Sequence, residues 1–343
     1  MKYIKQNISD MQAYVPGEQP RELHSVIKLN TNENPYPPSP RITEFLRSFD
    51  AERLRNYPDP AGREFCETAA ELFDVPPAWV QIGNGSDNLL VMLARACRGP
   101  VVVPTPTFPF YETQAIIEND GLKTVPFDED FNLPVQNLIR AGGAVTYVAN
   151  PASPTGGAVS VEVLAEMAAS LHNSGLLVID EAYADFAGFT AVPLVKEYDN
   201  VLVIRTLSKG YSLAGLRLGF AVSQPEILRE LWKTKEIYNV GVLPLEIGRI
   251  ALQDQEWKNQ NVQKILNSRK DVSAELKARS WRVYPSMANF VFAAPADGNS
   301  AAEYENLKEK GIFVRYFEKP GMLRITMGRP EENWTMLESL RQI

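Results

Sequence analysis

Residues 180–220 read DEAYADFAGFTAVPLVKEYDNVLVIRTLSKGYSLAGLRLGF. Three apolar runs lie in or beside this stretch, at residues 176–179, 201–204 and 218–222. Asp180 ends the first run, Lys209 follows the second, and Arg217 precedes the third. Apolar runs of this length are typical of strands buried on both faces of a parallel sheet, and such sheets bind ligands at the carboxyl ends of their strands. We therefore expect the acid, the lysine and the arginine to converge on one crevice.

An acid, a lysine and an arginine in one crevice are the groups that pyridoxal phosphate requires. The lysine forms a Schiff base with the aldehyde, the acid keeps the pyridine nitrogen protonated so that the ring acts as an electron sink, and a cation holds the phosphate. Tyr183 lies close enough after Asp180 to reach the ring hydroxyl, and Ser208 beside Lys209 offers a hydroxyl to the phosphate. The hypothesis rests on the combination, since each pair of residues alone is a common surface feature.

Length and composition limit the class of protein. The chain has 343 residues, of which 45% are hydrophobic and 22% charged, and its net charge is -7. The length predicts two domains, and the composition is ordinary for a soluble globular protein. An acidic chain is a poor candidate for binding nucleic acid. The first ten residues lack an apolar signal core and no run is long enough to span a bilayer, so we expect a cytoplasmic protein without membrane contact.

The cysteines and histidines argue against two other kinds of site. Cys66 and Cys97 have no neighbours at metal-ligand spacing, so we expect free thiols in a reducing compartment. His24 and His172 are the two histidines, which argues against a serine–histidine–acid triad and against a histidine-rich metal site. We therefore expect no metal.

Strand, helix and turn signals alternate as far as Arg217, which predicts an α/β fold with a mostly parallel central sheet and helices on both faces. We assign residues 40–255 to a large cofactor-binding domain, and residues 1–39 plus 256–343 to a small α+β domain with an N-terminal arm. The pattern from about residue 225 to 278 is helical with Pro244 as its main interruption, and one long helix should join the two domains. Beyond it we expect strand, strand, helix, strand, strand and helix, at residues 282–284, 290–293, 301–310, 312–316, 323–327 and 331–343.

Several loops supply further candidates for the cofactor site. Residues 83–87, G-N-G-S-D, precede an amphipathic run, so Ser86 or Asp87 could cap a helix whose free amides bind phosphate. Tyr111 follows a strand end and could stack on a flat ring. Asn150 stands at the end of another predicted strand.

The N-terminal loop and two late strands supply candidates for the substrate site. The loop at residues 28–38 is rich in proline and asparagine, and its Thr31, Asn32 and Asn34 could line a site. Arg324 lies in a strongly apolar strand, where a charge needs a bound anion or another partner. Arg315 lies on the neighbouring predicted strand.

Eight motifs together resemble the fold-type I pyridoxal-phosphate aminotransferases, and most closely the histidinol-phosphate aminotransferase subfamily. They span nearly the whole chain in the family's order: N-T-N-E-N-P (30–35), N-Y-P-D-P (56–60), G-N-G-S-D (83–87), P-T-F-P-F-Y (106–111), N-P-A-S-P-T-G (150–156), D-E-A-Y-A-D-F (180–186), R-T-L-S-K-G-Y-S-L-A-G-L-R-L-G-F (205–220) and L-R-I-T-M-G (323–328). The block around Lys209 is the most specific of them.

The resemblance implies a role for each matching residue. Lys209 would be the Schiff-base lysine and proton shuttle, Asp180 would pair with the pyridine nitrogen, and Tyr183 would bind the ring hydroxyl. The other cofactor contacts would come from Gly85, Ser86, Asp87, Tyr111, Asn150, Ser153, Ser208 and Arg217. Tyr57 would reach the cofactor phosphate of a neighbouring subunit, which implies a homodimer. Substrate contacts would come from Tyr14, Asn32, Arg315 and Arg324, with Arg324 on a carboxylate and Arg315 near a phosphate.

The sequence leaves open one cofactor contact, that of Ser153, and the choice of activity. The family usually has asparagine where this chain has Ser153, and a serine is shorter, so the contact with the ring hydroxyl is in question. The resemblance implies transfer of the amino group of histidinol phosphate to 2-oxoglutarate in histidine biosynthesis. The alternatives are an aromatic amino-acid aminotransferase, a decarboxylase of the threonine-phosphate type, and a binding protein that keeps the fold without turnover.

Overall fold

A seven-stranded sheet forms the centre of the large part of this computed structural model, which describes residues 3–13, 15–20 and 26–341. The strands lie in the order β2-β8-β7-β6-β5-β3-β4. Their bounds are β2 Val80–Gly83, β3 Val101–Thr105, β4 Leu122–Pro126, β5 Val145–Ala149, β6 Leu176–Asp180, β7 Val201–Thr206 and β8 Gly219–Ser223. Strand β8 runs antiparallel to both neighbours, and the other pairings are parallel. The predicted mostly parallel sheet is confirmed.

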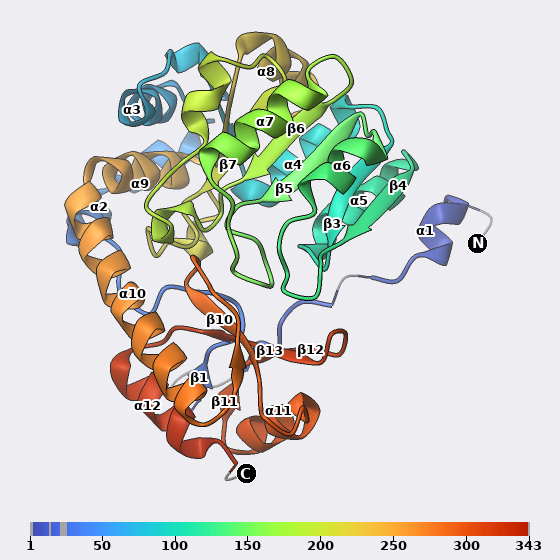
Figure 1. Cartoon of the computed structure of the whole chain (residues 1–343). Helices are drawn as coiled ribbons and strands as arrows, with labels where there is room; N and C mark the ends of the chain where they lie inside the picture. The colour runs from blue at the N-terminus through green and yellow to red at the C-terminus, as the bar shows by residue number, and fades with distance from the viewer. Residues whose placement is uncertain (1–2, 14, 21–25, 342–343) are drawn as a thin grey trace.

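Helices cover both faces of this sheet, because its strands are apolar on both sides. Successive side chains of a strand point to opposite faces, so Leu177 and Ile179 join the core on one side and Val178 joins the core on the other. Helices α3, α6, α7 and α9 pack on the first face, and α4, α5 and α8 pack on the second. Figure 1 shows the sheet between these two layers.

The helices of the large part follow signals in the sequence. Helices α2, α5 and α8 begin with proline, whose missing amide and fixed φ suit the first helical position. The bounds are α2 Pro40–Ser48, α3 Arg63–Phe73, α4 Gly85–Ala96, α5 Pro109–Glu118, α6 Val135–Ala141, α7 Val161–Leu171, α8 Pro225–Trp232 and α9 Val242–Gln253. His172 caps the C-terminal end of α7, as its sequence position predicts.

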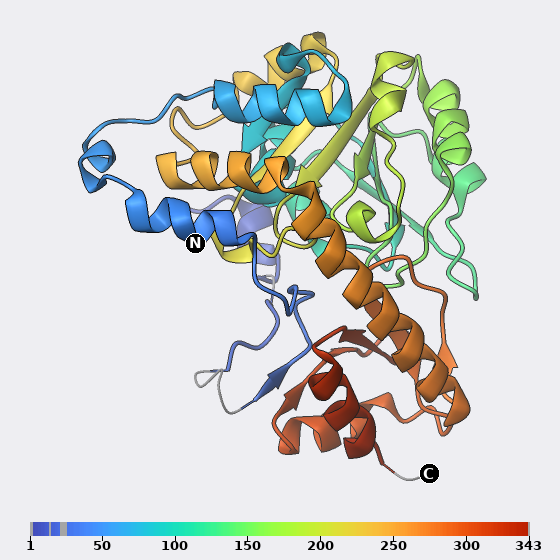
Figure 2. The same cartoon turned by 90° about the vertical axis from the view of Figure 1, so that its left-hand side faces the viewer.

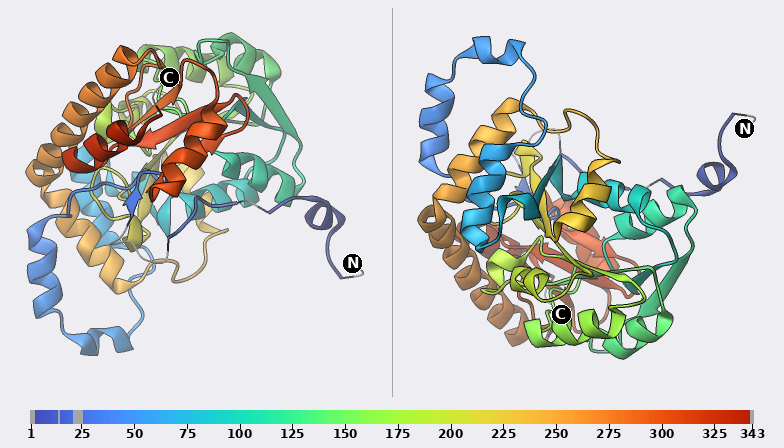
Figure 3. Two further views of the ribbon diagram at one scale, coloured as in Figure 1. Left: turned by 90° about the horizontal axis from the view of Figure 1, so that it is seen from below. Right: turned by 90° about the horizontal axis from the view of Figure 1, so that it is seen from above.

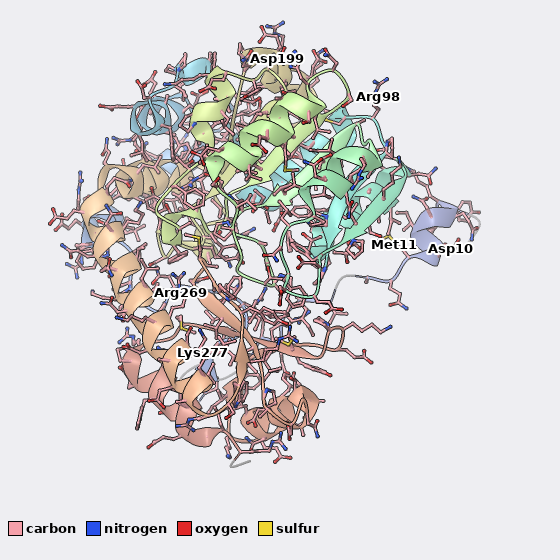
Figure 4. The ribbon with its side chains drawn as sticks, in the orientation of Figure 1. Asp10, Met11, Arg98, Asp199, Arg269 and Lys277 are labelled. Carbon is pink, nitrogen blue, oxygen red and sulfur yellow. The ribbon has the colours of Figure 1, made fainter. Side chains whose placement is uncertain are left out.

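A smaller α+β part lies below the sheet, and the long helix α10, Gln255–Ala278, runs from one part to the other (Figure 2). Its four-stranded sheet has the order β12-β13-β10-β9, and β1 pairs with β11 beside it. The bounds are β1 Ile27–Lys28, β9 Arg282–Val283, β10 Phe290–Ala294, α11 Ser300–Glu309, β11 Ile312–Phe313, β12 Arg315–Phe317, β13 Met322–Thr326 and α12 Pro330–Ser339. Arg269 of α10, labelled in Figure 4, donates to the Ala288 carbonyl at 2.6 Å and ties the helix to this part.

Strand β1 explains why the N-terminal segment belongs with the small part. Its parallel pairing with β11 joins residues at the two ends of the sequence. The short helix α1, Gln6–Asp10, lies away from this part, and Figure 3 shows it projecting beside the large part. The side chain of Asn7 donates there to the carbonyls of Ile116 and Ile117 on α5. The predicted division at residue 255 falls between α9 and α10 and stays a prediction.

The helical region from residue 225 to 278 is three helices, and the last of them, α10, is the expected long helix, but the expected interruption at Pro244 was wrong. Pro244 does not interrupt a helix, because it lies in the first turn of α9, where amides have no partner within the helix. The breaks fall at residues 233–241 and at Asp254, whose carboxylate accepts from the Trp257 amide and so caps α10.

Two expectations about strands were also wrong, and two further strands were not predicted. The unpredicted strands are β2 and β4. Each is short, and Pro76 and Pro77 before β2 and Gly121 before β4 are typical of turns. The expected strand at residues 312–316 is two strands, because β11 pairs with β1 while β12 pairs with β13. The third apolar run, β8, is antiparallel; its burial on both faces matches that of a parallel strand, so burial could not reveal its direction.

Candidate active site

A cavity of about 300 Å³ lies between the large sheet and the small part. Lys209 and Asp180 both line it, with Arg217 on the side of the large sheet and Arg315 and Arg324 on the side of the small part. The predicted residues that the cavity brings together are Asn32, Ser86, Asp87, Tyr111, Ser153, Asp180, Tyr183, Ser208, Lys209, Arg217, Arg315 and Arg324.

The strand directions explain this convergence. Strands β6 and β7 are parallel and in register, so Asp180 at the end of β6 lies opposite Ile204 and close to the turn that carries Lys209. Strand β8 is antiparallel, so its beginning lies at the same edge, and Arg217 directly before it joins the other two. The expected crevice at the carboxyl ends is therefore built from two strand ends and one strand start.

Asp180 is a buried acid with two hydrogen bonds. Its carboxylate accepts from the hydroxyl of Tyr111 at 2.6 Å and from the amide of Ala182 at 3.0 Å. Burial raises its pKa from 3.8 to about 6, against the opposing effect of these hydrogen bonds. A cation placed beside it would recover the energy lost on burial, so this carboxylate is suited to pair with a protonated ring nitrogen.

Lys209 is the half-buried amine of the cavity. Its Nζ donates to the carbonyl of Thr31 at 2.9 Å, which holds it at the N-terminal loop. Burial lowers its pKa, and the positive charge of Arg324 lowers it further. A larger neutral fraction makes an amine a better nucleophile and base. Asn34 fixes the backbone of this turn, since its side chain donates to the carbonyls of Lys209 and Gly210.

The start of helix α4 and Arg217 form an anion site. The guanidinium of Arg217 donates to Asp87 at 3.0 Å and to the Ser208 hydroxyl at 3.4 Å. Gly85 has φ +74°, and a Cβ there would lie 2.5 Å from Nη2 of Arg217, so glycine is required for this approach. The first helical amides and the hydroxyls of Ser86 and Ser208 complete a cradle for phosphate.

The expected capping role of Ser86 or Asp87 was wrong. Helix α4 begins at Gly85 with Asn84 as its N-cap, and no side chain caps it. Both residues lie in the first turn instead, where Ser86 and Asp87 line the cavity.

A buried polar network fixes Tyr183 over the cavity. Its hydroxyl accepts from the side-chain amide of Asn32 at 2.8 Å. Asn32 has φ +56° and is held by Thr326, whose hydroxyl donates to its side-chain oxygen at 2.9 Å, and by Asn289, which donates to its carbonyl. Because Asn32 donates to the phenol oxygen, the phenol proton is available to an acceptor in the cavity.

Two arginines from neighbouring strands line the substrate side. Arg324 donates to the Ser153 hydroxyl at 3.0 Å and to the Asn30 carbonyl at 3.1 Å, and it lies over the rings of Phe290 and Phe317. Arg315 lies directly opposite Arg324 in the antiparallel β12–β13 pair. It donates to the carbonyls of Val15 and Pro16 in the N-terminal arm. Ser153 therefore orients Arg324 in this structure.

Three predicted residues do not line the cavity, and a fourth is not among the described residues. Asn150 is buried, and its side chain exchanges two hydrogen bonds with the backbone of Val159, which closes the loop after β5 and does not line the cavity. Gly85 contributes through its lack of a side chain, which leaves room for the guanidinium of Arg217. Tyr57 is 79% exposed and stacks on Tyr238, with ring centroids 4.2 Å apart, away from the cavity. Tyr14 lies outside the described residues.

Sequence reasoning missed three contributions. The hydrogen bond from Tyr111 to Asp180 was missed because the aromatic motif around Tyr111 predicted ring stacking and not a hydrogen bond. In this structure the Tyr111 ring stacks on Tyr147. The acceptor for Lys209 is a backbone carbonyl, which no residue type reveals. Thr206 lines the cavity and donates to Ser208 at 2.9 Å. Its position between a strand end and the lysine turn could have indicated it.

Residues 3–13, 15–20 and 26–341 contain neither a metal-binding cluster nor a membrane-spanning helix. No group of three or more histidine, cysteine or acidic side chains there could hold a metal ion, and no helix there is long and apolar enough to cross a membrane. Cys66 and Cys97 are free thiols, and burial raises the pKa of Cys97 to about 11.

The fold and this cavity define a transferase of the α/β type. Residues 24–340 match the family model "Aminotransferase class I and II", and the chain belongs to that family. It is 46% identical to histidinol-phosphate aminotransferase 1 of Trichormus variabilis, over 99% of both chains. It is 42% identical to histidinol-phosphate aminotransferase of Syntrophotalea carbinolica, over the full length of both.

A solved structure shares the fold as well. Histidinol-phosphate aminotransferase of Sinorhizobium meliloti, in complex with pyridoxal-5'-phosphate, superposes with a TM-score of 0.90 at 25% identity, covering 98% of this chain and 96% of the other. L-threonine-O-3-phosphate decarboxylase of Porphyromonas gingivalis has a TM-score of 0.80 at 18% identity, over 92% of this chain and 98% of the other, which shows the same fold alone.

Proposed function

We propose that this protein is a pyridoxal-phosphate-dependent aminotransferase that moves the amino group of histidinol phosphate to 2-oxoglutarate. The observation that carries the proposal is that one cavity brings the half-buried Lys209 and the buried Asp180 together with two arginines of the small part. The full-length relatives that carry the name histidinol-phosphate aminotransferase support this substrate.

The residues of the cavity fit pyridoxal phosphate. The phosphate would lie at the cradle of Ser86, Ser208 and Arg217, where Gly85 leaves room for the guanidinium. Asp180 would then stand at the ring nitrogen and Tyr183 at the ring hydroxyl. When bound, the cofactor supplies an aldehyde that accepts amines and a ring that stabilises negative charge on the substrate carbon.

The chain's own residues hold and move the protons. Asp180 holds a proton on the ring nitrogen, since its burial makes a neighbouring cation favourable. Tyr183 donates its phenol proton to the ring oxygen, because Asn32 already occupies its oxygen as a donor. With the cofactor bound, Lys209 would be the base for the substrate, since its lowered pKa favours a neutral Nζ that could take the proton from the substrate's Cα and later give it back.

The substrate anions would bind at the two arginines. Arg324 is assigned to the carboxylate of glutamate or to the matching anion of the second substrate, and Arg315 to the phosphate of histidinol phosphate. Both now donate to carbonyl or hydroxyl oxygens, which are weaker acceptors than an anion. Asn32 is assigned to the same region through its place beside Tyr183, and Tyr14 is assigned to the phosphate from the resemblance alone.

We also propose a homodimer in the cytoplasm, with Tyr57 of each subunit at the partner's cofactor phosphate. Tyr57 is an exposed aromatic residue that lines a second cavity of about 310 Å³ together with Arg53 and Arg249. A large exposed aromatic beside arginines is typical of a surface that a partner covers.

The competing activities use the same cofactor, and one experiment separates them. The loaded enzyme is mixed with histidinol phosphate, and the absorption of the aldehyde form is followed. We expect this band to disappear and to return when 2-oxoglutarate is added, whereas a decarboxylase would not recover it with an oxo acid. A protein that merely binds would show no loss of the band. Phe108 and Phe317 in the cavity also suit an aromatic side chain, so phenylalanine is tested in parallel.

A further inference from the structure

A buried cluster of charges lies directly behind the candidate site. We call Arg205, Glu181, Asp185 and Lys258 the Arg205 cluster. Arg205 is the residue after Ile204 on β7, and its guanidinium donates to Glu181 and to Asp185, each at 2.8 Å. The side chains of these three residues are at most 7% exposed. None of the four lines the cavity, and the assigned cofactor and substrate contacts use none of them.

The Glu181 end of the cluster reaches the acid that faces the cavity. Glu181 follows Asp180 in the chain, and its amide donates to the Ile204 carbonyl, so both carboxylates hang from one strand end. The carboxylate of Glu181 also accepts from the hydroxyl of Thr190 and the amide of Ala191. With Arg205 as a third donor, it has no freedom to turn, and the backbone that carries Asp180 is fixed from behind.

The Asp185 end of the cluster reaches the lysine turn and the long helix. A Cβ on Gly210 would lie 2.3 Å from Oδ2 of Asp185, so the residue after Lys209 packs tightly on this carboxylate. Lys258 of α10 donates to Asp185 at 3.4 Å, and its Nζ lies 5.3 Å from the centre of the Tyr211 ring. Asp185 is therefore shared by β7, the lysine turn and the helix that leads to the small part.

We propose that Arg205 is a positioning residue: it fixes the separation between Asp180 and Lys209 and links both to helix α10. The inference rests on the proposed roles of these two residues. Its basis is that one guanidinium contacts both segments that carry the chemistry, Glu181 beside Asp180 and Asp185 against the Lys209–Gly210 turn.

The charges of the cluster indicate that it fixes the positions of its neighbours more than it stabilises the fold. Two carboxylates face two cations, so the cluster is neutral as a whole. Buried ion pairs often stabilise a fold no better than apolar residues of the same size, but their hydrogen bonds demand specific positions. The planar fork of arginine binds both carboxylates at once, and lysine cannot reproduce this.

The test uses the full chain loaded with pyridoxal phosphate and measures kcat, KM and the rate of cofactor loss on dilution. Glu181→Gln keeps the volume and removes one charge, and Asp74→Asn is its matched control at the exposed Asp74–Lys196 pair. Because small displacements at a reacting centre cost up to about 10²-fold, we expect kcat of Glu181→Gln to fall at least about ten-fold per bound cofactor, with a smaller change in KM. Asp74→Asn should match the wild type.

Three further variants test the same inference. Arg205→Lys should recover part of the kcat lost in Arg205→Gln, since it restores the charge but reaches one carboxylate. If Glu181→Gln fails to fold, Lys258→Met, at the partly exposed end, should lower kcat by a few-fold. Wild-type kcat and cofactor loss in folded variants that differ only in thermal stability would overturn the inference. Borohydride reduction of the wild type separately locates the cofactor: its absence from Lys209 would defeat the proposed function itself.

Discussion

The two sides of the cavity are built differently. The cofactor side, Asp180, Ser208, Lys209 and Arg217, comes from strand ends and turns of one sheet, within forty residues of sequence. The substrate side joins Arg315 of the small part to the carbonyls of Val15 and Pro16, and Arg324 to the carbonyl of Asn30. The side chains of the cofactor side extend from neighbouring strands of one sheet, and Lys209 and Arg217 also donate to Thr31 and Asp87. On the substrate side the two arginines lie on paired strands of the small part and donate to carbonyls of the N-terminal segment.

From this difference we expect the cofactor side to determine the rate of the chemical steps and the substrate side to determine which substrates are accepted. A proton transfer needs groups held to within a fraction of an ångström, and strands packed on both faces supply that rigidity. Substrate anions differ in size and charge, and an arginine that donates to a neutral carbonyl can exchange that acceptor for a stronger, charged one. Variants on the cofactor side should therefore lower every reaction equally, and variants on the substrate side should lower some reactions more than others.

Lys209→Ala gives the largest expected effect. Because Lys209 is the half-buried amine placed to bond the cofactor and to move the proton, turnover should fall by roughly 10⁴-fold or more with every substrate. The cofactor should still bind through the phosphate cradle, without a covalent link. Mass spectrometry after borohydride reduction measures the link, and a reducible link in the variant would contradict the assignment.

Asp180→Asn should have the next largest effect. Loss of one partner of a buried charge pair costs about 2–5 kcal/mol, so the rate of the amino-donor half-reaction should fall by roughly 10² to 10³-fold. Single-turnover absorbance measures that rate for histidinol phosphate and for glutamate. Equal loss for both fits a cofactor-side residue, and unequal loss would break the division between the two sides.

The raised pKa of Asp180 predicts an effect on stability without cofactor. Below about pH 4 both the folded and the unfolded chain hold the proton. As the pH rises the unfolded chain releases it first, because the folded pKa is about 6 against an ordinary 3.8, so this contribution to stability is lost through that window. The difference corresponds to about 3 kcal/mol. Denaturant unfolding from pH 4 to pH 7 should therefore show a steeper fall for the wild type than for Asp180→Asn, and parallel curves would refute the shift.

Much of the cofactor side could be predicted from sequence, for a physical reason. Strand periodicity and chain order place Asp180 and Lys209 at one sheet edge, whereas Arg217, which precedes β8, reaches that edge because β8 is antiparallel. The direction of β8 and the hydroxyl of Tyr111 on Asp180 were not predictable, because burial and residue type are the same in either arrangement. Asn150 lies at a strand end as predicted. Its side chain bonds to the backbone of Val159 and closes a loop, so it does not line the cavity.

The substrate side was less predictable because tertiary pairing creates it. The β1–β11 and β12–β13 pairings bring Asn30 and Arg315 to the cavity, and neither pairing is visible as a local pattern. The contact of Ser153 with Arg324 is likewise a contact between the two parts, which sequence spacing could not give.

Tyr57→Phe should have the smallest effect and tests whether the cofactor side extends across a dimer. Loss of one hydrogen bond to a charged group costs about 1.5–3 kcal/mol, so cofactor affinity should fall by roughly ten-fold or more, with little change in kcat at saturating cofactor. Hybrid dimers of Tyr57→Phe with Lys209→Ala should contain one site free of both changes. Failure of mixed subunits to recover wild-type cofactor affinity would place Tyr57 in its own subunit or outside the site.

The most direct test of the account is the selectivity of Arg315→Ala. We would measure kcat/KM for histidinol phosphate, phenylalanine and glutamate with the wild type, Arg315→Ala and Arg324→Ala. A phosphate dianion needs more positive charge than a carboxylate, so Arg315→Ala should lower kcat/KM for histidinol phosphate by about 10 to 10²-fold and change the other two little. Arg324→Ala should lower all three. Equal losses in Arg315→Ala, or a wild type that prefers phenylalanine, would contradict the assignment to histidinol phosphate and leave a general aminotransferase.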